Sequence, residues 1–262
     1  ILGSLPFETV FPYSLSVIPL FVLMGVFASR AGLSKSIYSA VNAFIGHYRG
    51  GLGMATVGAC AGFGAICGSS LATAATMSKV AMPEMRNRNY DDGLAAASIA
   101  AGGTLGVLIP PSVIMVIYAL LVEQSIGKMF AAAIIPGIVA TLLYMAVVWL
   151  RTMYNQQLGP AGERTSWTER FRVLLNVWQV LLLFAVVIGG IYLGWFSPTE
   201  AAAVGAMGAL LLALAKRQLN KSVFFQCLSE TATTSGMIFL ILIGTGVFNY
   251  FIETTGLPHL LV

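Results

Sequence analysis

The sequence predicts an all-α polytopic membrane protein, and three observations support this prediction. Of the 262 residues, 58% are hydrophobic and only 9% are charged, whereas soluble domains carry roughly 25% charged residues. The mean hydropathy is +0.86. Apolar blocks of helix length recur along the chain without the period-two alternation of strands. The composition therefore argues against a soluble enzyme, a disordered protein and a nucleic-acid-binding protein.

The apolar blocks are separated by charged residues, glycines and prolines. In chain order they are 11–29, 36–46, 51–82, 93–122, 129–150, 173–194, 199–215 and 233–252. A polar linker at 152–171 and an amphipathic stretch at 216–231 interrupt the second half. A membrane-spanning helix needs about 20 residues, so 36–46 is too short to cross, and about six crossings are expected in total.

Positively charged residues orient these blocks. Lys and Arg collect on the cytoplasmic side of membrane proteins, which places Arg164 and the rest of the linker inside. If 51–82 crossed the membrane once, Arg49 would lie on the opposite side from Arg86. If the tract enters and leaves on one side, every one of the 14 basic residues except Lys128 lies inside. The charges therefore favour a re-entrant helical hairpin at 51–82.

The composition of this tract agrees with a hairpin. Most residues from Gly53 to Thr76 are Gly, Ala, Ser, Thr or Cys, and we expect the turn at Gly68-Ser69-Ser70. About 25 Å of helix precedes this turn, which would carry it deep into the membrane. The alternative is a single crossing helix whose Gly58-x-x-x-Gly62 pattern packs against a neighbour.

The block at 93–122 holds a second irregularity. Gly102-Gly103-Thr104-Leu105-Gly106 lies at its centre, and Pro110-Pro111-Ser112 follows. Proline lacks a backbone N–H and clashes with the carbonyl group four residues earlier in a helix. We expect a helix that is broken between 102 and 110, with free carbonyl oxygens; the alternative is one kinked span.

Two polar breaks at similar depth are typical of the substrate and ion site of a secondary transporter. Na⁺ prefers oxygen ligands, which hydroxyl and carbonyl groups supply. The helix after Ser70 would also direct its N-terminal N–H groups at a substrate carboxylate. The residues expected at a Na⁺ site are Gly68, Ser69, Ser70, Gly102, Gly103, Thr104 and Gly106. Those expected to face the substrate are Ser69, Ser70, Thr73, Pro110, Pro111 and Ser112.

A faint internal repeat relates the two ends of the chain. Residues 12–37 align with 236–261, and Phe27-x4-Gly32-Leu33 matches Phe251-x4-Gly256-Leu257. The first copy contains basic residues and is expected inside, whereas the second copy does not and is expected outside. Equivalent segments of opposite orientation indicate an inverted repeat.

Together these motifs resemble the large membrane subunit of tripartite ATP-independent periplasmic (TRAP) transporters, the DctM-like family, along almost the whole chain. The matching motifs are Gly64-Ala65-Ile66-Cys67-Gly68-Ser69-Ser70-Leu71-Ala72-Thr73-Ala74, Gly103-Thr104-Leu105-Gly106-Val107-Leu108-Ile109-Pro110-Pro111-Ser112, Ser125-Ile126-Gly127-Lys128-Met129-Phe130 and Ser197-Pro198-Thr199-Glu200-Ala201-Ala202.

The resemblance implies an elevator-type permease of the bacterial inner membrane. Its substrates would be organic anions such as C4-dicarboxylates, sialic or other sugar acids, or keto acids, with Na⁺ as the coupling ion and no other cofactor. It also implies two partners: a small four-helix membrane subunit, and a periplasmic binding protein that delivers the solute.

The resemblance also divides the chain. Residues 1–50 would be scaffold helices, 51–128 the first-repeat transport unit, 129–232 scaffold spans and 233–262 the truncated start of the second repeat. Because the chain starts without Met and stops inside a hydrophobic stretch, we expect an incomplete fragment whose second hairpin and second Na⁺ site lie beyond its end. The motif Ser197-Pro198-Thr199-Glu200 is expected to be a capping box with a structural role.

Two other function classes are considered. One is an uncoupled channel or structural membrane subunit. The other is an intramembrane protease with Ser69 or Ser70 as nucleophile, which would need a base within hydrogen-bond reach; His47 and His259 are both expected at membrane edges, so no enzymatic activity is predicted. The three cysteines form no CxxC pair and are interpreted as packing residues rather than disulfide partners or metal ligands.

Overall fold

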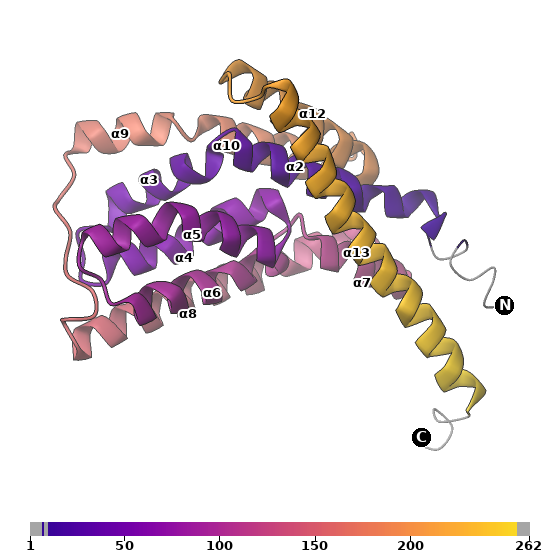
Figure 1. Cartoon of the computed structure of the whole chain (residues 1–262), viewed down its shortest axis with the longest axis horizontal. Helices are drawn as coiled ribbons and strands as arrows, with labels where there is room; N and C mark the ends of the chain where they lie inside the picture. The colour runs from indigo at the N-terminus through magenta and orange to yellow at the C-terminus, as the bar shows by residue number, and fades with distance from the viewer. Residues whose placement is uncertain (1–6, 8–9, 256–262) are drawn as a thin grey trace.

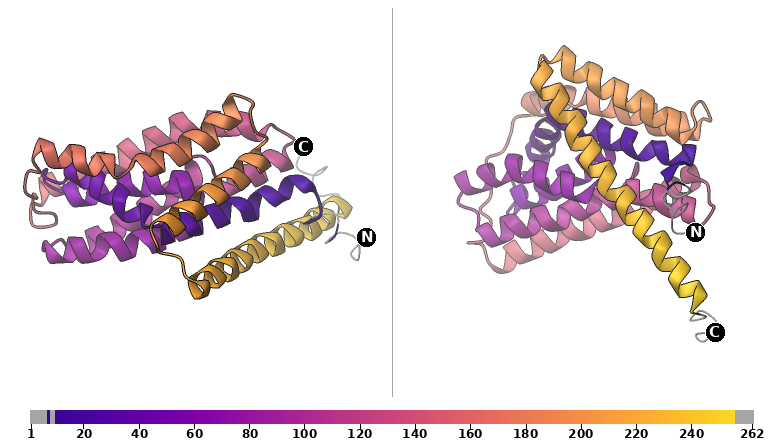
Figure 2. Two further views of the ribbon diagram at one scale, coloured as in Figure 1. Left: turned by 90° about the horizontal axis from the view of Figure 1, so that it is seen from above. Right: turned by 45° about the vertical axis from the view of Figure 1, so that its right-hand side comes forward.

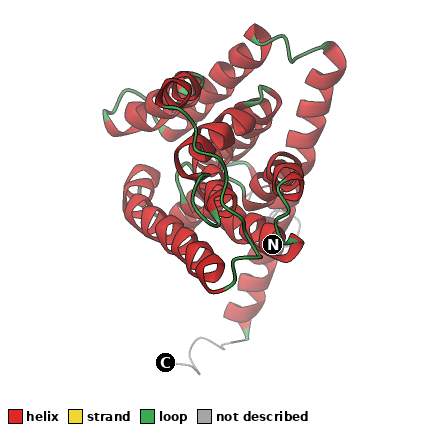
Figure 3. Cartoon of the chain, turned by 90° about the vertical axis from the view of Figure 1, so that its left-hand side faces the viewer, coloured by secondary structure: helices red, strands yellow, loops and turns green. Residues whose placement is uncertain are grey.

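The computed structural model describes residue 7 and residues 10–255, and this part of the chain is helical with no strand (Figure 1, Figure 3). The all-α prediction is therefore confirmed for the described residues. The helices are η1 (Tyr13–Ser16), α2 (Val17–Arg30), α3 (Leu33–Ile45), α4 (Gly51–Cys67), α5 (Ser70–Asn87), α6 (Asp92–Leu108), α7 (Val113–Leu121), α8 (Ile126–Tyr154), α9 (Trp167–Leu175), α10 (Trp178–Phe184), η2 (Ala185–Gly189), α11 (Gly190–Tyr192), α12 (Pro198–Ala215) and α13 (Lys221–Thr254).

Several of these helices have the length of a membrane span. Within the described residues, four are long and apolar enough to cross a bilayer, and six crossings result if each of two bent helix pairs forms one span. This number agrees with the six crossings expected from the sequence.

Helices α4 and α5 form a helical hairpin. Gly68 has a left-handed backbone with φ of 64°, and Ser69 is extended, so the chain reverses within two residues. At the other end of the pair, the Thr56 hydroxyl lies 3.5 Å from the Met85 sulfur. The two helices are therefore antiparallel neighbours, and the alternative of one continuous helix over 51–82 is wrong.

The expected position of the break in the next block is also wrong. Helix α6 continues through Gly102–Gly106 to Leu108, and the break lies at 109–112, where α6 and α7 bend by 41°. The glycines allow close packing instead: a Cβ on Gly102 would lie 2.9 Å from the Cys60 sulfur of α4. The prolines decide where the helix ends, because neither Pro110 nor Pro111 can donate a backbone hydrogen bond.

Helix α3 lies along α4. Cβ atoms on Gly58 and Gly62 would lie 3.0 Å from the side chains of Val41 and Ile37. The small-residue pattern of α4 thus receives larger side chains of α3, as close helix packing requires. Because this packing is antiparallel, the start of α3 lies well away from the end of the molecule that holds Arg49.

The remaining helices surround this group. Figure 1 shows α3, α4, α5, α6 and α8 lying roughly alongside one another, and Figure 2 shows α13 crossing the outside of the other helices. Helix α12 packs along α2, where a Cβ on Gly205 would meet the Met24 sulfur.

Two boundaries in the second half differ from the prediction. The expected span at 173–194 begins inside α9, and the chain bends by 44° between α9 and α10. The expected stretch at 216–231 and span at 233–252 join into one helix, α13, of 34 residues. No proline interrupts α13, and the Asn220 side chain caps it by accepting a hydrogen bond from Val223 N. The first part of α13 is more polar than the second, and the helix continues through both.

The linker between α8 and α9 closes one end of the molecule. Its non-helical part is confined to 155–166. Gly159 O accepts a hydrogen bond from Gly50 N at 3.0 Å, and Leu158 O accepts one from Asp91 N at 3.1 Å. The open end of the hairpin, the start of α6 and the end of α8 therefore share one end of the molecule, together with Arg49, Arg86, Arg88 and Arg151.

Some basic residues counted with this group lie elsewhere, among them Lys35 in the first turn of α3. Lys79 is near the middle of α5, and Arg30 pairs with Glu230 of α13 at 3.5 Å. The neighbouring Ser29 hydroxyl lies 3.3 Å from that of Thr76. Since Thr76 is ten residues before Arg86 on α5, Arg30 lies about 15 Å along the hairpin from the basic end.

Helix α2 contains the middle of the first copy of the proposed repeat, 12–37, and the second copy, 236–261, lies in α13 as far as Thr254. At the spacing of 224 residues, the last residue of α2, Arg30, corresponds to the last residue of α13, Thr254. The two helices are antiparallel, because Phe27 stacks on Phe224 while Leu15 shares a cavity with Thr245. The matching Gly256 and Leu257, and the rest of 256–262, lie outside the described residues.

Candidate functional site

The turn of the hairpin and the break between α6 and α7 are in direct contact. The amide of Val113 donates a hydrogen bond to Gly68 O at 3.3 Å. A Cβ on Gly68 would lie 2.7 Å from the carbonyl oxygen of Pro111. The two polar breaks predicted from the sequence therefore form a single place in the fold.

Four helix ends meet at this point. Helices α4 and α6 end here, and α5 and α7 begin here. Ser69 and Ser112 are the N-caps of α5 and α7, and their hydroxyls accept hydrogen bonds from Ala72 N and Met115 N, each at 3.4 Å. Helix N-termini attract negative charge, and helix C-termini attract cations. The arrangement suits an anion and a cation side by side.

Oxygen atoms are concentrated between Thr73 and Gly106. Thr73 is fully buried, and its hydroxyl has no hydrogen-bond partner within the described chain. A Cβ on Gly106 would lie 2.7 Å from this hydroxyl oxygen and 2.9 Å from Ser69 O. The carbonyl of Gly106 has no donor four residues later, because that residue is Pro110. These oxygens are the type of ligand that Na⁺ prefers.

The structure brings most of the predicted site residues together. Gly68, Ser69, Thr73, Gly106, Pro111 and Ser112 gather where the two breaks touch. Ser70 and Gly103 are adjacent, since a Cβ on Gly103 would lie 3.3 Å from Ser70 O. Pro110 is buried in the break itself.

Two predicted residues face other helices. Gly102 packs against Cys60 of α4. Thr104 is exposed, and its hydroxyl donates to Ala101 O at 2.7 Å and lies 3.4 Å from the Tyr144 hydroxyl of α8. The continuation of α6 explains both positions. Residue 104 points away from the face that carries Gly106, whereas Gly102 lies on that face one turn earlier, against α4.

Helix α2 approaches the hairpin turn closely, which the sequence did not predict. A Cβ on Gly25 would lie 2.8 Å from the Cα of Cys67. Beside this contact, a polar cavity of about 350 Å³ lies between α2, α5 and α13, and its lining includes Arg30, Lys79 and Glu230. Ionisable residues within an apolar region are the sequence signal that could have located it.

The motif at 197–200 forms the predicted capping box. Glu200 N donates to the Ser197 hydroxyl at 3.3 Å, and Ser197 N donates to the Glu200 carboxylate at 2.7 Å. Pro198 occupies the first helical position of α12, and Thr199 follows it.

The geometry does not assemble a serine nucleophile with a base. His47 lies before the start of α4 and Ser69 just after its end, about 25 Å apart along the helix. His259 lies outside the described residues. The cysteines 60, 67 and 227 are free and buried, and the described residues hold no group of three or more His, Cys, Asp or Glu side chains suited to a metal ion.

Comparison with known proteins identifies what the chain is similar to. The sequence model of the family described as "Tripartite ATP-independent periplasmic transporter, DctM component" matches residues 1–262. The C4-dicarboxylate TRAP transporter large permease protein DctM of Pseudomonas aeruginosa is 37% identical, over 97% of this chain and 59% of the relative. The sialic acid TRAP transporter large permease protein SiaM of Vibrio cholerae is 33% identical, over 95% of this chain and 58% of the relative.

A third relative is the isethionate TRAP transporter permease protein DctMQ of Oleidesulfovibrio alaskensis. It is 33% identical, over 98% of this chain and 42% of the relative. The chain thus spans about three fifths or less of the length of each of these three relatives.

Proposed function

The chain belongs to the DctM component family of the tripartite ATP-independent periplasmic transporters, and from this membership we propose that it is part of a permease that couples the import of an organic acid to Na⁺. The family is one of membrane transporters rather than of enzymes, and the apolar helices make this chain a multi-pass membrane protein. The substrate class we propose is a carboxylate, because the named relatives include a C4-dicarboxylate and a sialic acid transporter.

The observation that carries this proposal is the contact between the two helix breaks. The buried, unpartnered Thr73 hydroxyl, Ser69 O and the free carbonyl of Gly106 would supply ligands to Na⁺. The N-termini of α5 and α7 start beside them and would attract the substrate carboxylate. A bound cation and a bound carboxylate would stabilise each other at this distance, which is the physical basis of coupling.

The arrangement of α2 and α13 supports an inverted repeat. They end at equivalent positions and run in opposite directions, as repeats of inverted topology require. In this proposal 51–128 is the mobile transport unit, 1–50 and 129–232 form the scaffold, and 233–262 begins the second repeat. The unit would move past the scaffold at the contact of α2 with the hairpin.

The proposed partners are a small four-helix membrane subunit and a periplasmic binding protein, in the inner membrane of a bacterium. The name of the DctMQ relative supports a close association of two permease components. Orientation follows from the end of the molecule that gathers Arg49, Arg86, Arg88 and Arg151, which we place in the cytoplasm.

The test uses the complete transporter, with its small subunit and binding protein, in liposomes. Uptake of labelled succinate and sialic acid is measured against external Na⁺, with and without an imposed Na⁺ gradient. Thr73→Val should weaken the activation by Na⁺ because it deletes a ligand. Ser69→Ala should weaken it because it removes the hydroxyl that caps α5 and fixes the turn. Ser98→Ala is the matched control, because this buried hydroxyl of α6 is bonded to Leu94 O at 2.8 Å and lies away from the site.

Two results would contradict the proposal. Unchanged Na⁺ activation in both site variants would overturn the assignment of the site. Uptake that never exceeds equilibration under a Na⁺ gradient would instead favour the uncoupled channel or structural subunit.

A further inference from the structure

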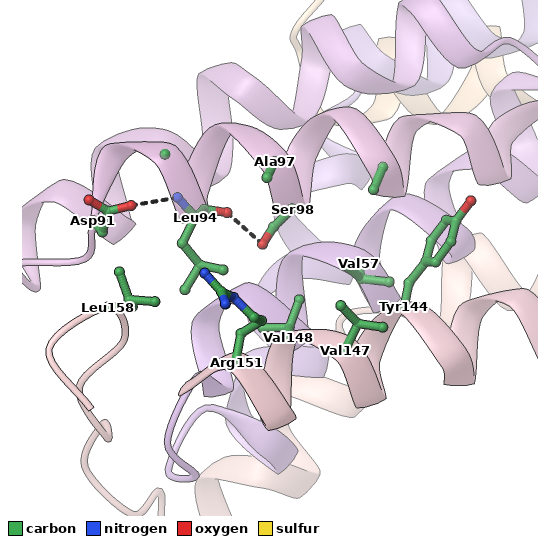
Figure 4. Close-up of a pocket in the computed structure, with 12 residues that line it drawn as sticks. Val57, Asp91, Leu94, Ala97, Ser98, Tyr144, Val147, Val148, Arg151 and Leu158 are labelled. Carbon is green, nitrogen blue, oxygen red and sulfur yellow. Dashed lines mark hydrogen bonds between the residues drawn. The ribbon is translucent and has the colours of Figure 1, made fainter. Parts of the chain in front are cut away.

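An apolar groove runs between α6 and α8 from Tyr144 toward Arg151 (Figure 4). Its volume is about 490 Å³, and its walls include Leu94, Ala97, Ala101, Val147 and Val148. The one serine in the wall, Ser98, donates its hydroxyl hydrogen to Leu94 O at 2.8 Å. Since that hydroxyl is already bonded, the walls are suited to hydrocarbon rather than to a polar solute.

The groove is apolar along its length and charged at one end. Figure 4 shows the Arg151 guanidinium directed into the groove beside Leu94, with Asp91 and Leu158 at the same end and Tyr144 at the other. From Arg151 to Tyr144 is seven residues of α8, or about 10 Å.

The charged end opens into a polar hollow. This hollow has a volume of about 500 Å³ and shares Asp91 and Leu158 with the groove. Its lining adds Asn89, Asn155 and Gln157. An apolar groove that adjoins a polar hollow matches a molecule with a hydrocarbon chain and a polar head, which is the form of a phospholipid.

The charges at the junction are balanced. Arg86 in the hollow is paired with Asp92 at 2.8 Å. Among the described residues, neither Arg151 nor Asp91 has an ion-pair partner, which leaves one cation and one carboxylate. A headgroup with one phosphate and one ammonium complements this pair, whereas a purely anionic headgroup would meet the Asp91 carboxylate.

The location agrees with this occupant. Arg151 lies in the last turn of α8, the most apolar of the four span-length helices, at the end of the molecule that holds Arg49 and Arg88. Arginine at such a boundary meets lipid phosphates, and basic pockets between helices on the cytoplasmic side bind lipid headgroups.

We propose that this groove binds phosphatidylethanolamine from the inner leaflet. One acyl chain lies between α6 and α8, the phosphodiester accepts hydrogen bonds from Arg151, and the ammonium group donates to Asp91. The site is separate from the transport site, and only its assignment to the inner leaflet rests on the orientation proposed above.

The experiment uses the complete permease with its small subunit, reconstituted in nanodiscs of equal phosphatidylethanolamine and phosphatidylglycerol. Lipid retained after extraction into mild detergent is identified by native mass spectrometry. The wild type should retain phosphatidylethanolamine. Arg151→Gln should lower the retained fraction about tenfold, because a charge-assisted hydrogen bond is lost.

Further variants separate the groove from the headgroup site. Ala97→Phe places a ring in the groove from an exposed position and should expel the lipid without unfolding the protein. Asp91→Asn keeps the cap on α6, since asparagine is as good an N-cap as aspartate, and should shift retention toward phosphatidylglycerol. Arg172 is an exposed cation on α9 outside the groove, so Arg172→Gln should leave lipid retention unchanged.

Three results would overturn the proposal. They are no retained lipid in the wild type, retention in Ala97→Phe equal to that of the wild type, or a wild type that prefers phosphatidylglycerol.

Discussion

A methyl group on Gly106 of α6 would lie only 2.7 Å from the hydroxyl oxygen of Thr73 in the hairpin. No wider side chain fits between these helices, so the backbone of α6 lies directly against the first turn of α5. This contact holds the Thr73 hydroxyl and the carbonyl group of Ser69 beside the backbone of Gly106. The relationship leads to two predictions at the site.

Gly106→Ala should destabilise the protein. The added methyl would lie 2.7 Å from the Thr73 hydroxyl and 2.9 Å from Ser69 O, so α5 and α6 must separate. Overpacking of this kind costs about 1–3 kcal/mol. Thermal unfolding of the detergent-solubilised protein measures the loss, and stabilisation by Na⁺ should fall in the same samples because the oxygen atoms move apart.

Gly244→Ala is the matched control for this substitution. A Cβ on Gly244 in α13 meets no atom within 4 Å, so only helix propensity changes, and stability should be unchanged or rise by up to about 1 kcal/mol. Equal unfolding temperatures for the two alanine variants would contradict the close contact of α5 and α6.

Thr73→Val should raise stability without Na⁺ and remove stabilisation by Na⁺. The substitution keeps the shape of the side chain and deletes a buried hydroxyl that has no partner in the described chain. An unsatisfied buried group costs about 1–3 kcal/mol, so its removal helps the protein in Na⁺-free buffer. Unfolding temperature measured in choline and in Na⁺ buffers tests both effects.

Thr56→Val distinguishes a ligand from an ordinary buried threonine. The Thr56 hydroxyl is equally buried, but it donates to Leu52 O at 2.8 Å. This variant should lose about 1 kcal/mol in both buffers and keep the full response to Na⁺. If Thr73→Val behaved in the same way, Thr73 would have no role in binding the ion.

The contact between the linker and the hairpin's open end should weaken in mild acid. The pKa of His47 is lowered from its ordinary value of 6.5 by burial of the ring and by the nearby Arg170 and Arg164. The unfolded chain therefore binds a proton more readily than the folded chain, and stability falls as the pH drops below about 6.5. Gly162 N donates a hydrogen bond to Gly46 O beside this histidine. The protection of the Gly162 amide against hydrogen exchange therefore reports the weakening of this contact.

Hydrogen exchange of the 155–166 linker, corrected for the intrinsic rate, measures this effect. Protection should decline from pH 7.5 to 5.5 in the wild type and decline less in His47→Asn. Arg170→Gln should also reduce the decline, because a repulsive charge is removed. The same pH profile in all three proteins would show that another group controls the contact.

Local chemistry along the chain made several features predictable. Gly68-Ser69-Ser70 predicted the hairpin turn, because glycine permits a left-handed backbone and serine caps the following helix. The capping box at Ser197 and Glu200 was predictable for the same reason. The charge pattern also anticipated that Arg49 and Arg86 lie at the same end of the molecule, since a hairpin returns to the side that it left.

The position of the second break and the surroundings of each site residue were not predictable in this way. Glycines at 102–106 permit either a break or a tight helix contact. Packing against the neighbouring α4 favours the contact. Arg30 was assigned to the basic end by its charge, yet α3 packs antiparallel on α4 and places Arg30 beside Glu230. The sequence by itself determined which segments are apolar and helical and where the turns can form, because those properties depend on neighbouring residues. Only the tertiary structure decided that Thr73 meets Gly106 and that Gly68 meets Val113, because such contacts depend on how separate helices pack.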